Sequence, residues 1–153
     1  DPEGRAGEDH RPETHLIPLT IDAALGRRPA LKLFGTDYPT RDGSCIRDYI
    51  HVTDLADAHV RALGQIDHRS VPYNIGNGQG YSNLEVIRSV ERVSGRKVPW
   101  EAAPRRAGDP SLLVADSTTL RKETGWEPRF GDLDRIVETA LRWRESHPNG
   151  YAI

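Results

Sequence analysis

Apolar residues recur every three or four positions in four stretches of the chain, a spacing that predicts helices with one buried face. These stretches cover residues 14–25, 54–66, 82–93 and 133–143, and a cap at Asp116 or Ser117 predicts a further helix through Glu123. Ser82 and Glu85 form an S-x-x-E capping box at the start of the third helix, and Gly95 follows where a helix would end. Thr53 is the expected cap of the second helix. The inward face of that second helix is expected to carry Leu55, Ala58, His59, Ala62, Leu63 and Ile66.

Shorter apolar runs between the helices predict strands at residues 31–34, 45–52, 71–75, 98–102 and 112–115. Polar segments rich in Gly and Pro, at residues 1–13, 35–44 and 104–110, read as loops. Because strands alternate with helices along the chain, the pattern predicts an α/β fold with at least some parallel strand pairs.

Length and composition fit one compact domain, or part of a larger one, with a thin core, since 36% of the 153 residues are hydrophobic. A net charge of −2 provides no general attraction for nucleic acid or an anionic membrane, so neither is an expected partner. The single Cys45 excludes an intramolecular disulfide, and no apolar run is long enough to cross a bilayer. We therefore expect a cytoplasmic protein.

The beginning of the chain is polar and resembles a loop. It reads Asp1-Pro2-Glu3-Gly4, and the sequence contains no Met at all. This start favours a piece cut from a longer protein.

Common catalytic and metal-binding motifs are not found. No two of the six histidines have the H-x-x-x-H spacing that places two imidazoles on one helix face, so no metal site is expected. No G-x-S-x-G elbow presents a nucleophile, although spacing alone does not exclude a Ser-His-Asp site. Residues 76–80 are rich in Gly but lack the G-x-G-x-x-G spacing, which favours an ordinary turn over a phosphate-binding loop.

The loop of residues 104–110 is more informative because it combines two guanidinium groups with a carboxylate. Arg105 or Arg106 can bind a diphosphate with two hydrogen bonds, while Asp109 can accept hydrogen bonds from a ribose. A cluster of surface ion pairs explains the same composition equally well. Arg47, beside Asp48 in a predicted strand, is a second such cation, and on its own it would most often form a structural ion pair.

Longer motifs occur in a fixed order along nearly the entire chain. They are Gly-Glu-Asp-His at 7–10, F-G-x-D-Y-P-T from Phe34, R-D-Y-I-H-V from Arg47, D-L-A-D-A-H from Asp54, Tyr-Asn-Ile-Gly at 73–76, P-R-R-x-G-D from Pro104 and His-Pro-x-Gly-Tyr at 147–151. In this order and spacing the chain resembles the UDP-galactose (UDP-glucose) 4-epimerases of the extended short-chain dehydrogenase/reductase superfamily.

The resemblance implies a role for particular residues. Arg47 and Arg106 would hold the diphosphate, Asp109 the ribose, and residues 32–34 would lie along the uracil. The full set of substrate-binding residues that it implies is His15, Leu16, Lys32, Leu33, Phe34, Arg47, Tyr49, Asn83, Arg106, Asp109 and Leu113. His15 departs from the Asn of several members, and Leu113 stands where others have a bulky Tyr or a small Cys that admits N-acetylated sugars.

The resemblance also implies what this chain does not contain. In the family, NAD and a catalytic Tyr-x-x-x-Lys pair belong to the amino-terminal half, and no Tyr here is followed four positions later by Lys. Residues 1–153 would be the carboxy-terminal, UDP-sugar-binding half, with no catalytic or NAD-binding residue. Within it, residues 54–76 would supply one helix and one strand that complete the Rossmann sheet of the missing half. The complete protein is expected to be a homodimer.

These implications predict a chain that grips a UDP-sugar but does not catalyse epimerisation alone. Two alternatives stay open: a non-catalytic UDP-sugar-binding module, and half of another nucleotide-sugar dehydratase or decarboxylase. Without its other half, the chain would expose a sheet edge and an apolar helix face, which favours self-association.

Overall fold

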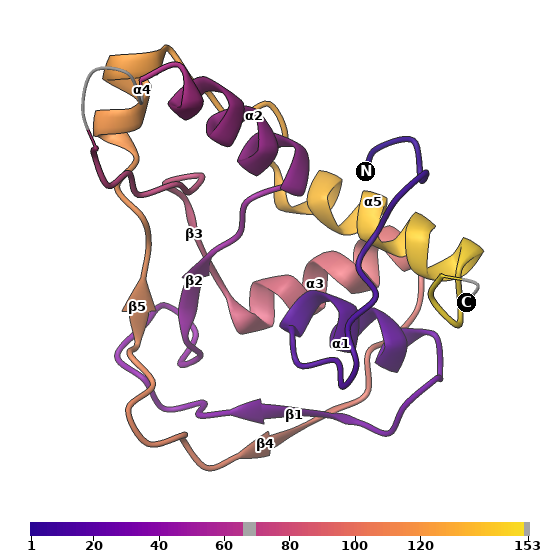
Figure 1. Cartoon of the computed structure of the whole chain (residues 1–153). Coiled ribbons are helices and arrows are strands. Elements are labelled where there is room, and N and C mark those ends of the chain that lie inside the picture. The colour runs from indigo at the N-terminus through magenta and orange to yellow at the C-terminus, as the bar shows by residue number, and fades with distance from the viewer. Residues whose placement is uncertain (66–69, 152–153) are drawn as a thin grey trace.

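The computed structural model describes residues 1–65 and 70–151 (Figure 1). Its elements, in chain order, are α1 (Leu16–Ala24), β1 (Leu31–Phe34), β2 (Ile46–Asp48), α2 (Val52–Leu63), β3 (Gly80–Ser82), α3 (Asn83–Ser94), β4 (Trp100–Ala103), β5 (Leu112–Leu113), α4 (Thr118–Thr124) and α5 (Leu133–Ser146). None of the helices in the described ranges is long and apolar enough to traverse a lipid bilayer.

The strands form two small sheets. β1 pairs in parallel with β4, with Leu31 opposite Trp100 and Phe34 opposite Ala103. β2 lies between β3, its antiparallel neighbour, and β5, its parallel neighbour. The predicted α/β fold with parallel pairs is therefore confirmed.

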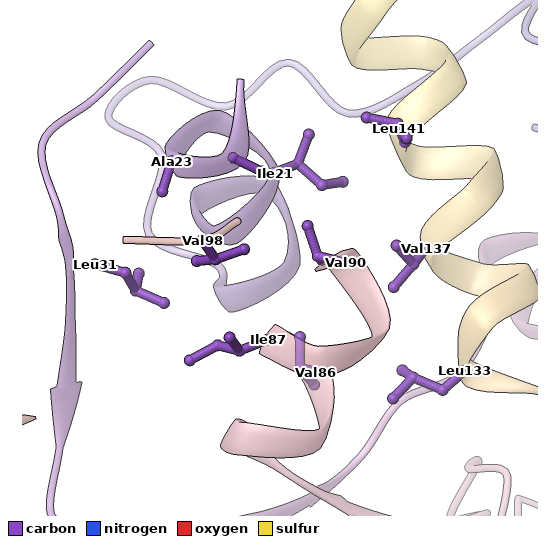
Figure 2. Close-up of a cluster of buried hydrophobic side chains, with 11 residues drawn as sticks. Ile21, Ala23, Leu31, Val86, Ile87, Val90, Val98, Leu133, Val137 and Leu141 are labelled. Carbon is purple, nitrogen blue, oxygen red and sulfur yellow. The ribbon is translucent and has the colours of Figure 1, made fainter. Parts of the chain in front are cut away.

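Helices α1, α3 and α5 enclose the main hydrophobic core. Figure 2 shows Ile21 of α1, Val86 and Val90 of α3 and Val137 of α5 in one cluster, and all four side chains are fully buried. Each such side chain contributes about 1.5–3 kcal/mol through its removal from water. This packing fixes the start of α1 and of α3, which both lie beside the cavity described below.

A second, smaller core lies under α2 and α4, at the end of the molecule away from β1 and β4 (Figure 1). Its centre is Trp126, which packs with Ala58 and Leu120. The indole Nε1 donates a hydrogen bond of 3.0 Å to the carbonyl oxygen of Asp54. The side-chain carboxylate of Asp54, which is also buried, accepts the backbone N–H groups of Arg129 and Phe130, and this ties the first turn of α2 to the segment before α5.

The start of α3 agrees with the sequence prediction in detail. Ser82 accepts a hydrogen bond from the Glu85 backbone N–H, and the Glu85 carboxylate accepts one from the Ser82 N–H. Gly95 ends the helix with a φ of 66°, a left-handed conformation that glycine adopts without a steric penalty.

The prediction for α2 was wrong in its cap and in part of its buried face. The helix starts two residues earlier than expected, and the imidazole of His51, not Thr53, accepts the capping hydrogen bond. His59 is exposed and Leu63 is 63% exposed, because α2 turns Asp54 and Ala58 toward Trp126 instead. The predicted inward residue Ile66 lies outside the described residues.

Two strand predictions also differ from the structure. Residues 71–75 are irregular and belong to neither of the two sheets. Tyr73 in this segment instead packs against the second core and donates a 2.5 Å hydrogen bond to the Glu123 carboxylate. The strand expected over residues 45–52 shrinks to β2, because His51 already caps a helix that begins at Val52. Residues 80–82, read as part of a turn and a helix cap, form β3.

Candidate functional site

A cavity of about 540 Å³ opens beside β1, at the start of α1 and of α3. The segment from Arg28 to Phe34 forms one wall, β2 contributes Arg47, and the loop of residues 104–110 contributes Arg106 and Asp109. Nine of the eleven residues expected from the sequence line it: Leu16, Lys32, Leu33, Phe34, Arg47, Tyr49, Asn83, Arg106 and Asp109.

Side chains of β1 point alternately into the core and outward, and this alternation positions the wall of the cavity. Leu31 and Leu33 are buried, whereas Lys32 is exposed and Phe34 is half-buried, so Lys32 and Phe34 share the outward face. The guanidinium carbon of Arg106 lies 3.9 Å from the centre of the Phe34 ring. A cation over an aromatic face at this distance is a favourable contact, so Phe34 orients Arg106 toward the cavity.

Arg47 and Asp109 form an ion pair within the cavity. β2 carries Arg47 and has a paired strand on each side, which holds its backbone in place. The guanidinium also donates a 2.7 Å hydrogen bond to the carbonyl oxygen of Ile46, and the thiol of Cys45 donates to the second oxygen of Asp109 at 3.7 Å. Cys45 and Arg47, two positions apart in the chain, thus each hold one oxygen of the Asp109 carboxylate.

The cavity is strongly cationic. The side chains of Arg28, Lys32, Arg47 and Arg106 line it, and Asp109 is the one carboxylate among its lining residues in the described structure. Arg47 and Arg106 come from distant parts of the sequence and meet at this cavity, as the sequence predicted. An arrangement with more guanidinium groups than carboxylates suits a doubly charged anion such as a diphosphate.

Tyr49 and Asn83 add neutral polar groups. Burial raises the pKa of the Tyr49 phenol well above its usual value, although the charge of Arg47 opposes this, so the hydroxyl is protonated at neutral pH and can donate a hydrogen bond. Asn83 is the first residue of α3, and its backbone N–H donates to the carbonyl oxygen of Cys45 at 3.0 Å. That bond joins α3 to the chain segment that carries Arg47.

The structure does not bring His15 and Leu113 to the cavity lining. The Nδ1 atom of His15 lies 2.8 Å from a carboxylate oxygen of Glu8 and 2.9 Å from one of Glu13. Leu113 lies on β5, opposite Arg47 in the strand register, and is 60% exposed. A nucleotide-sugar role for these two residues stays a prediction.

Several lining residues were missed by the sequence reasoning, among them Leu19 and Arg28. The Nε atom of Arg28 is buried and has no hydrogen-bond partner among the described residues. The sequence offered a signal, since residues 24–28, Ala-Leu-Gly-Arg-Arg, are a further segment that resembles the 4-epimerases, and Arg28 lies three positions before β1. An orphaned guanidinium donor beside a cavity fits an anionic or carbonyl-bearing ligand.

The glycine-rich segment of residues 76–80 does not fit a binding site for the pyrophosphate of NAD. It lacks the dinucleotide-binding spacing, and the backbone N–H groups of Asn77 and Gly78 already donate to the Asp48 carboxylate, at 2.9 and 3.0 Å. Since Asp48 occupies these N–H groups, they are not available to a pyrophosphate.

Comparisons with known proteins identify relatives. A family model described as the NAD dependent epimerase/dehydratase family matches residues 2–76. A UDP-glucose 4-epimerase of Lacticaseibacillus casei is 49% identical over 152 residues, which are 98% of this chain and 46% of that protein. Another, from Halalkalibacterium halodurans, is 51% identical over 154 residues, or 99% of this chain and 46% of that protein.

Solved structures give the same result. A crystal structure of UDP-glucose 4-epimerase matches with a TM-score of 0.94 and 48% identity, over 100% of this chain and 47% of that one. The UDP-glucose 4-epimerase from Bifidobacterium longum in complex with NAD+ and UDP matches with a TM-score of 0.89 and 38% identity, over 99% of this chain and 45% of that one. The chain therefore spans slightly less than half the length of the relatives that it matches.

Proposed function

We propose that this chain, which resembles UDP-glucose 4-epimerases along nearly its full length, is the UDP-sugar-binding, carboxy-terminal half of such an enzyme. The observation that carries the proposal is the shared cavity of Arg47 and Arg106, which Asp109 also lines and where it pairs with Arg47. The complete protein would interconvert UDP-glucose and UDP-galactose. Relatives whose names say that they are UDP-glucose 4-epimerases support this choice over a dehydratase or decarboxylase.

The proposed binding mode follows from the cavity lining. The two guanidinium groups hold the diphosphate, and the Asp109 carboxylate accepts hydrogen bonds from the ribose hydroxyls. The uracil lies along Lys32, Leu33 and Phe34, which line the cavity side by side on β1. Asp109 then has two roles. It binds the ribose, and before the ligand arrives its ion pair holds Arg47 in place.

This mode gives the chain a clear part in an epimerisation. When the configuration at one sugar carbon is inverted, the sugar must present its two faces to the catalytic groups in turn. The protein must therefore bind the nucleotide firmly and leave the sugar free to rotate. Binding energy from the non-reacting nucleotide then keeps the reacting group within reach while it turns. NAD would supply the redox chemistry when bound by the remaining half, and no residue of this chain is assigned to that step.

We also propose that residues 54–76 complete the sheet of that remaining half. The support is an apolar surface on α2, where Val52, Val60 and Leu63 are 59–67% exposed. An apolar helix face of this kind is what a missing neighbour would cover. The complete protein is further proposed to be a cytoplasmic homodimer.

Calorimetry with UDP tests the binding proposal. The 153-residue chain is expected to bind UDP, and the Arg47→Ala and Arg106→Ala variants are expected to bind it more weakly. The chain by itself is expected not to convert UDP-galactose, whereas the protein that also carries the remaining half is expected to do so. Turnover by the 153-residue chain would contradict the assignment. If both variants bind UDP as tightly as the unaltered chain, the cavity is not the UDP site.

A further inference from the structure

A second group of polar side chains lies just before α1, outside the cavity lining. His10, Glu13 and His15 each place one donor atom so that all three atoms lie within 4.8 Å of one another. The rings of His10 and His15 are 5.2 Å apart. These residues belong to an irregular segment, so a search for histidines spaced along one helix face does not find them.

Glu13 is the buried member of this group. Its side chain is only 10% exposed. One carboxylate oxygen accepts the backbone N–H groups of Thr14 and His15, both at 2.8 Å, and lies 2.9 Å from the His15 ring. The other oxygen is buried and has no hydrogen-bond partner among the described residues. A buried carboxylate oxygen without a partner is costly, which points to a missing positively charged ligand.

The charge around His15 has the sign that a cation requires. Glu8 places a carboxylate oxygen 2.8 Å from the same ring nitrogen that Glu13 approaches. Two carboxylates around one imidazole leave the cluster negative even when the imidazole is protonated. A divalent cation in place of that proton would neutralise both carboxylates.

We propose that His10, Glu13 and His15 bind a divalent transition-metal ion, with zinc as the best match. Two imidazole nitrogens and a carboxylate are a common donor set for zinc, whereas calcium and magnesium prefer oxygen donors alone. Ligands at zinc distances in a tetrahedral site lie about 3.4 Å apart. The three donor atoms lie within 4.8 Å of one another, so side-chain rotations have to bring them closer together to reach zinc distances. Glu8 or water then takes the fourth position.

This site lies outside the nucleotide cavity but next to it along the chain. His15 is the residue that precedes α1, and its neighbours Thr14 and Leu16 both line the cavity. A metal ion held by residues 10–15 would fix the backbone that presents these two side chains. Zinc binding and UDP binding are separate measurements, so the failure of one leaves the other intact.

Titration of the metal-free 153-residue chain with zinc chloride alone, followed by calorimetry, tests the proposal. One zinc ion per chain is expected, with affinity at least about tenfold lower in His10→Ala and in His15→Ala. His59→Ala removes a similarly exposed imidazole on α2 and is the matched control, with unchanged affinity expected. His10 is exposed, and within residues 1–65 and 70–151 its ring contacts the ring of His15, so His10→Ala is expected to fold normally by circular dichroism.

Cobalt(II) substitution gives a second readout. A tetrahedral Co²⁺ site is expected to show visible absorption bands in the unaltered chain and in His59→Ala, but not in His10→Ala. Absence of zinc binding by the unaltered chain would overturn the proposal. So would binding that is equally strong in all three histidine variants, because the ion would then be held elsewhere.

Discussion

Arg105 and Arg106 are adjacent in the chain, yet their guanidinium groups face different surroundings. Arg105 donates to Asp37 at 2.8 Å and lies over the Tyr38 ring, whereas Arg106 lies over Phe34 at the cavity. Arg106→Ala is expected to weaken UDP binding by about 1.5–3 kcal/mol, the usual contribution of a hydrogen bond to a charged group. This corresponds to a dissociation constant roughly ten to 150 times higher.

Arg105→Ala is the matched control for that prediction. Since Arg105 does not line the cavity, its loss is expected to leave the dissociation constant for UDP nearly unchanged in the same calorimetric measurement. A larger effect from Arg105 than from Arg106 would show that the wrong guanidinium was assigned.

The sequence predicted much of the cavity lining because the resemblance rests on motifs with fixed spacing. Arg47 and Arg106 were expected to converge although nothing local connects them, and both line the cavity. His15 and Leu113 were expected there as well, but the direction of a side chain depends on its neighbours in space. Glu8 and Glu13 draw His15 to themselves, and Leu113 lies on the exposed strand β5.

The cap of α3 joins several elements through one small side chain. Ser82 accepts the Glu85 N–H and donates to the Asp42 carboxylate, in the loop before β2. Ser82→Ala is expected to lower the free energy of unfolding by about 0.5–2 kcal/mol, the usual cost of losing a helix cap. Urea denaturation of both proteins measures this difference.

Ser94→Ala provides the comparison at the other end of the same helix. Its hydroxyl donates to the Val90 carbonyl within the helix and accepts the backbone N–H of Arg96 at 3.2 Å. Because Arg96 is exposed, water can replace that acceptor when Ser94 is lost, so a smaller effect is expected than at Ser82. An effect at Ser94 as large as that at Ser82 would contradict the role of the cap.

His51 makes the stability of α2 dependent on pH. Its imidazole caps α2, lies 3.1 Å from the Thr139 hydroxyl of α5 and stacks on the Phe130 ring. Burial lowers the pKa of His51 below its usual 6.5, with smaller effects from the chain amino terminus and Arg135, and Asp54 opposes the shift. The neutral form is thus favoured in the folded state, and its contribution is complete above pH 6.5 and is lost as the pH falls through the lowered pKa.

We therefore expect the free energy of unfolding to fall between pH 7 and pH 5 more steeply in the unaltered chain than in His51→Asn. Asn is a good helix cap that does not titrate, so the helix start is retained. Urea denaturation at a series of pH values measures both slopes. Parallel curves would mean that His51 does not titrate in this range.

The sequence predicted best those features of an element that depend only on nearby residues, such as the start and the end of a helix. The capping box and Gly95 lie within one helix, and both are confirmed. Residues 71–75 have the composition of a strand, but a strand also needs a neighbour, which no local pattern supplies. The buried face of α2 was partly wrong for a similar reason, since Trp126, over 60 positions later in the sequence, determines which residues turn inward.

The resemblance to the 4-epimerases is confirmed by relatives that match nearly all of this chain. What the sequence did not reveal is how much apolar surface the described structure leaves uncovered. Val60 and Leu63 on α2 are 67% and 63% exposed. Apolar patches of this kind favour association with a second copy when the natural neighbour is absent.

We expect the 153-residue chain to self-associate at high concentration, and Leu63→Glu to shift it toward the monomer, because a carboxylate is costly to bury in a contact. Static light scattering over a concentration series measures the mean mass. Leu112→Glu introduces the same charge at a similarly exposed position on β5, which is 58% exposed, and is expected to have little effect. A monomer at every concentration would contradict the prediction.

The parallel pairing of β1 with β4 has a consequence for how such a protein can diversify. Because both strands run in one direction and end side by side at Phe34 and Ala103, the loops that leave them start from a common edge. Arg106 of the loop of residues 104–110 lies over Phe34 at the end of β1, and Asp109 of the same loop pairs with Arg47 of β2. A change in the length or charge of this loop would therefore reach both small sheets at once, so we expect the loop, β1 and β2 to vary together among homologues and not as separate modules.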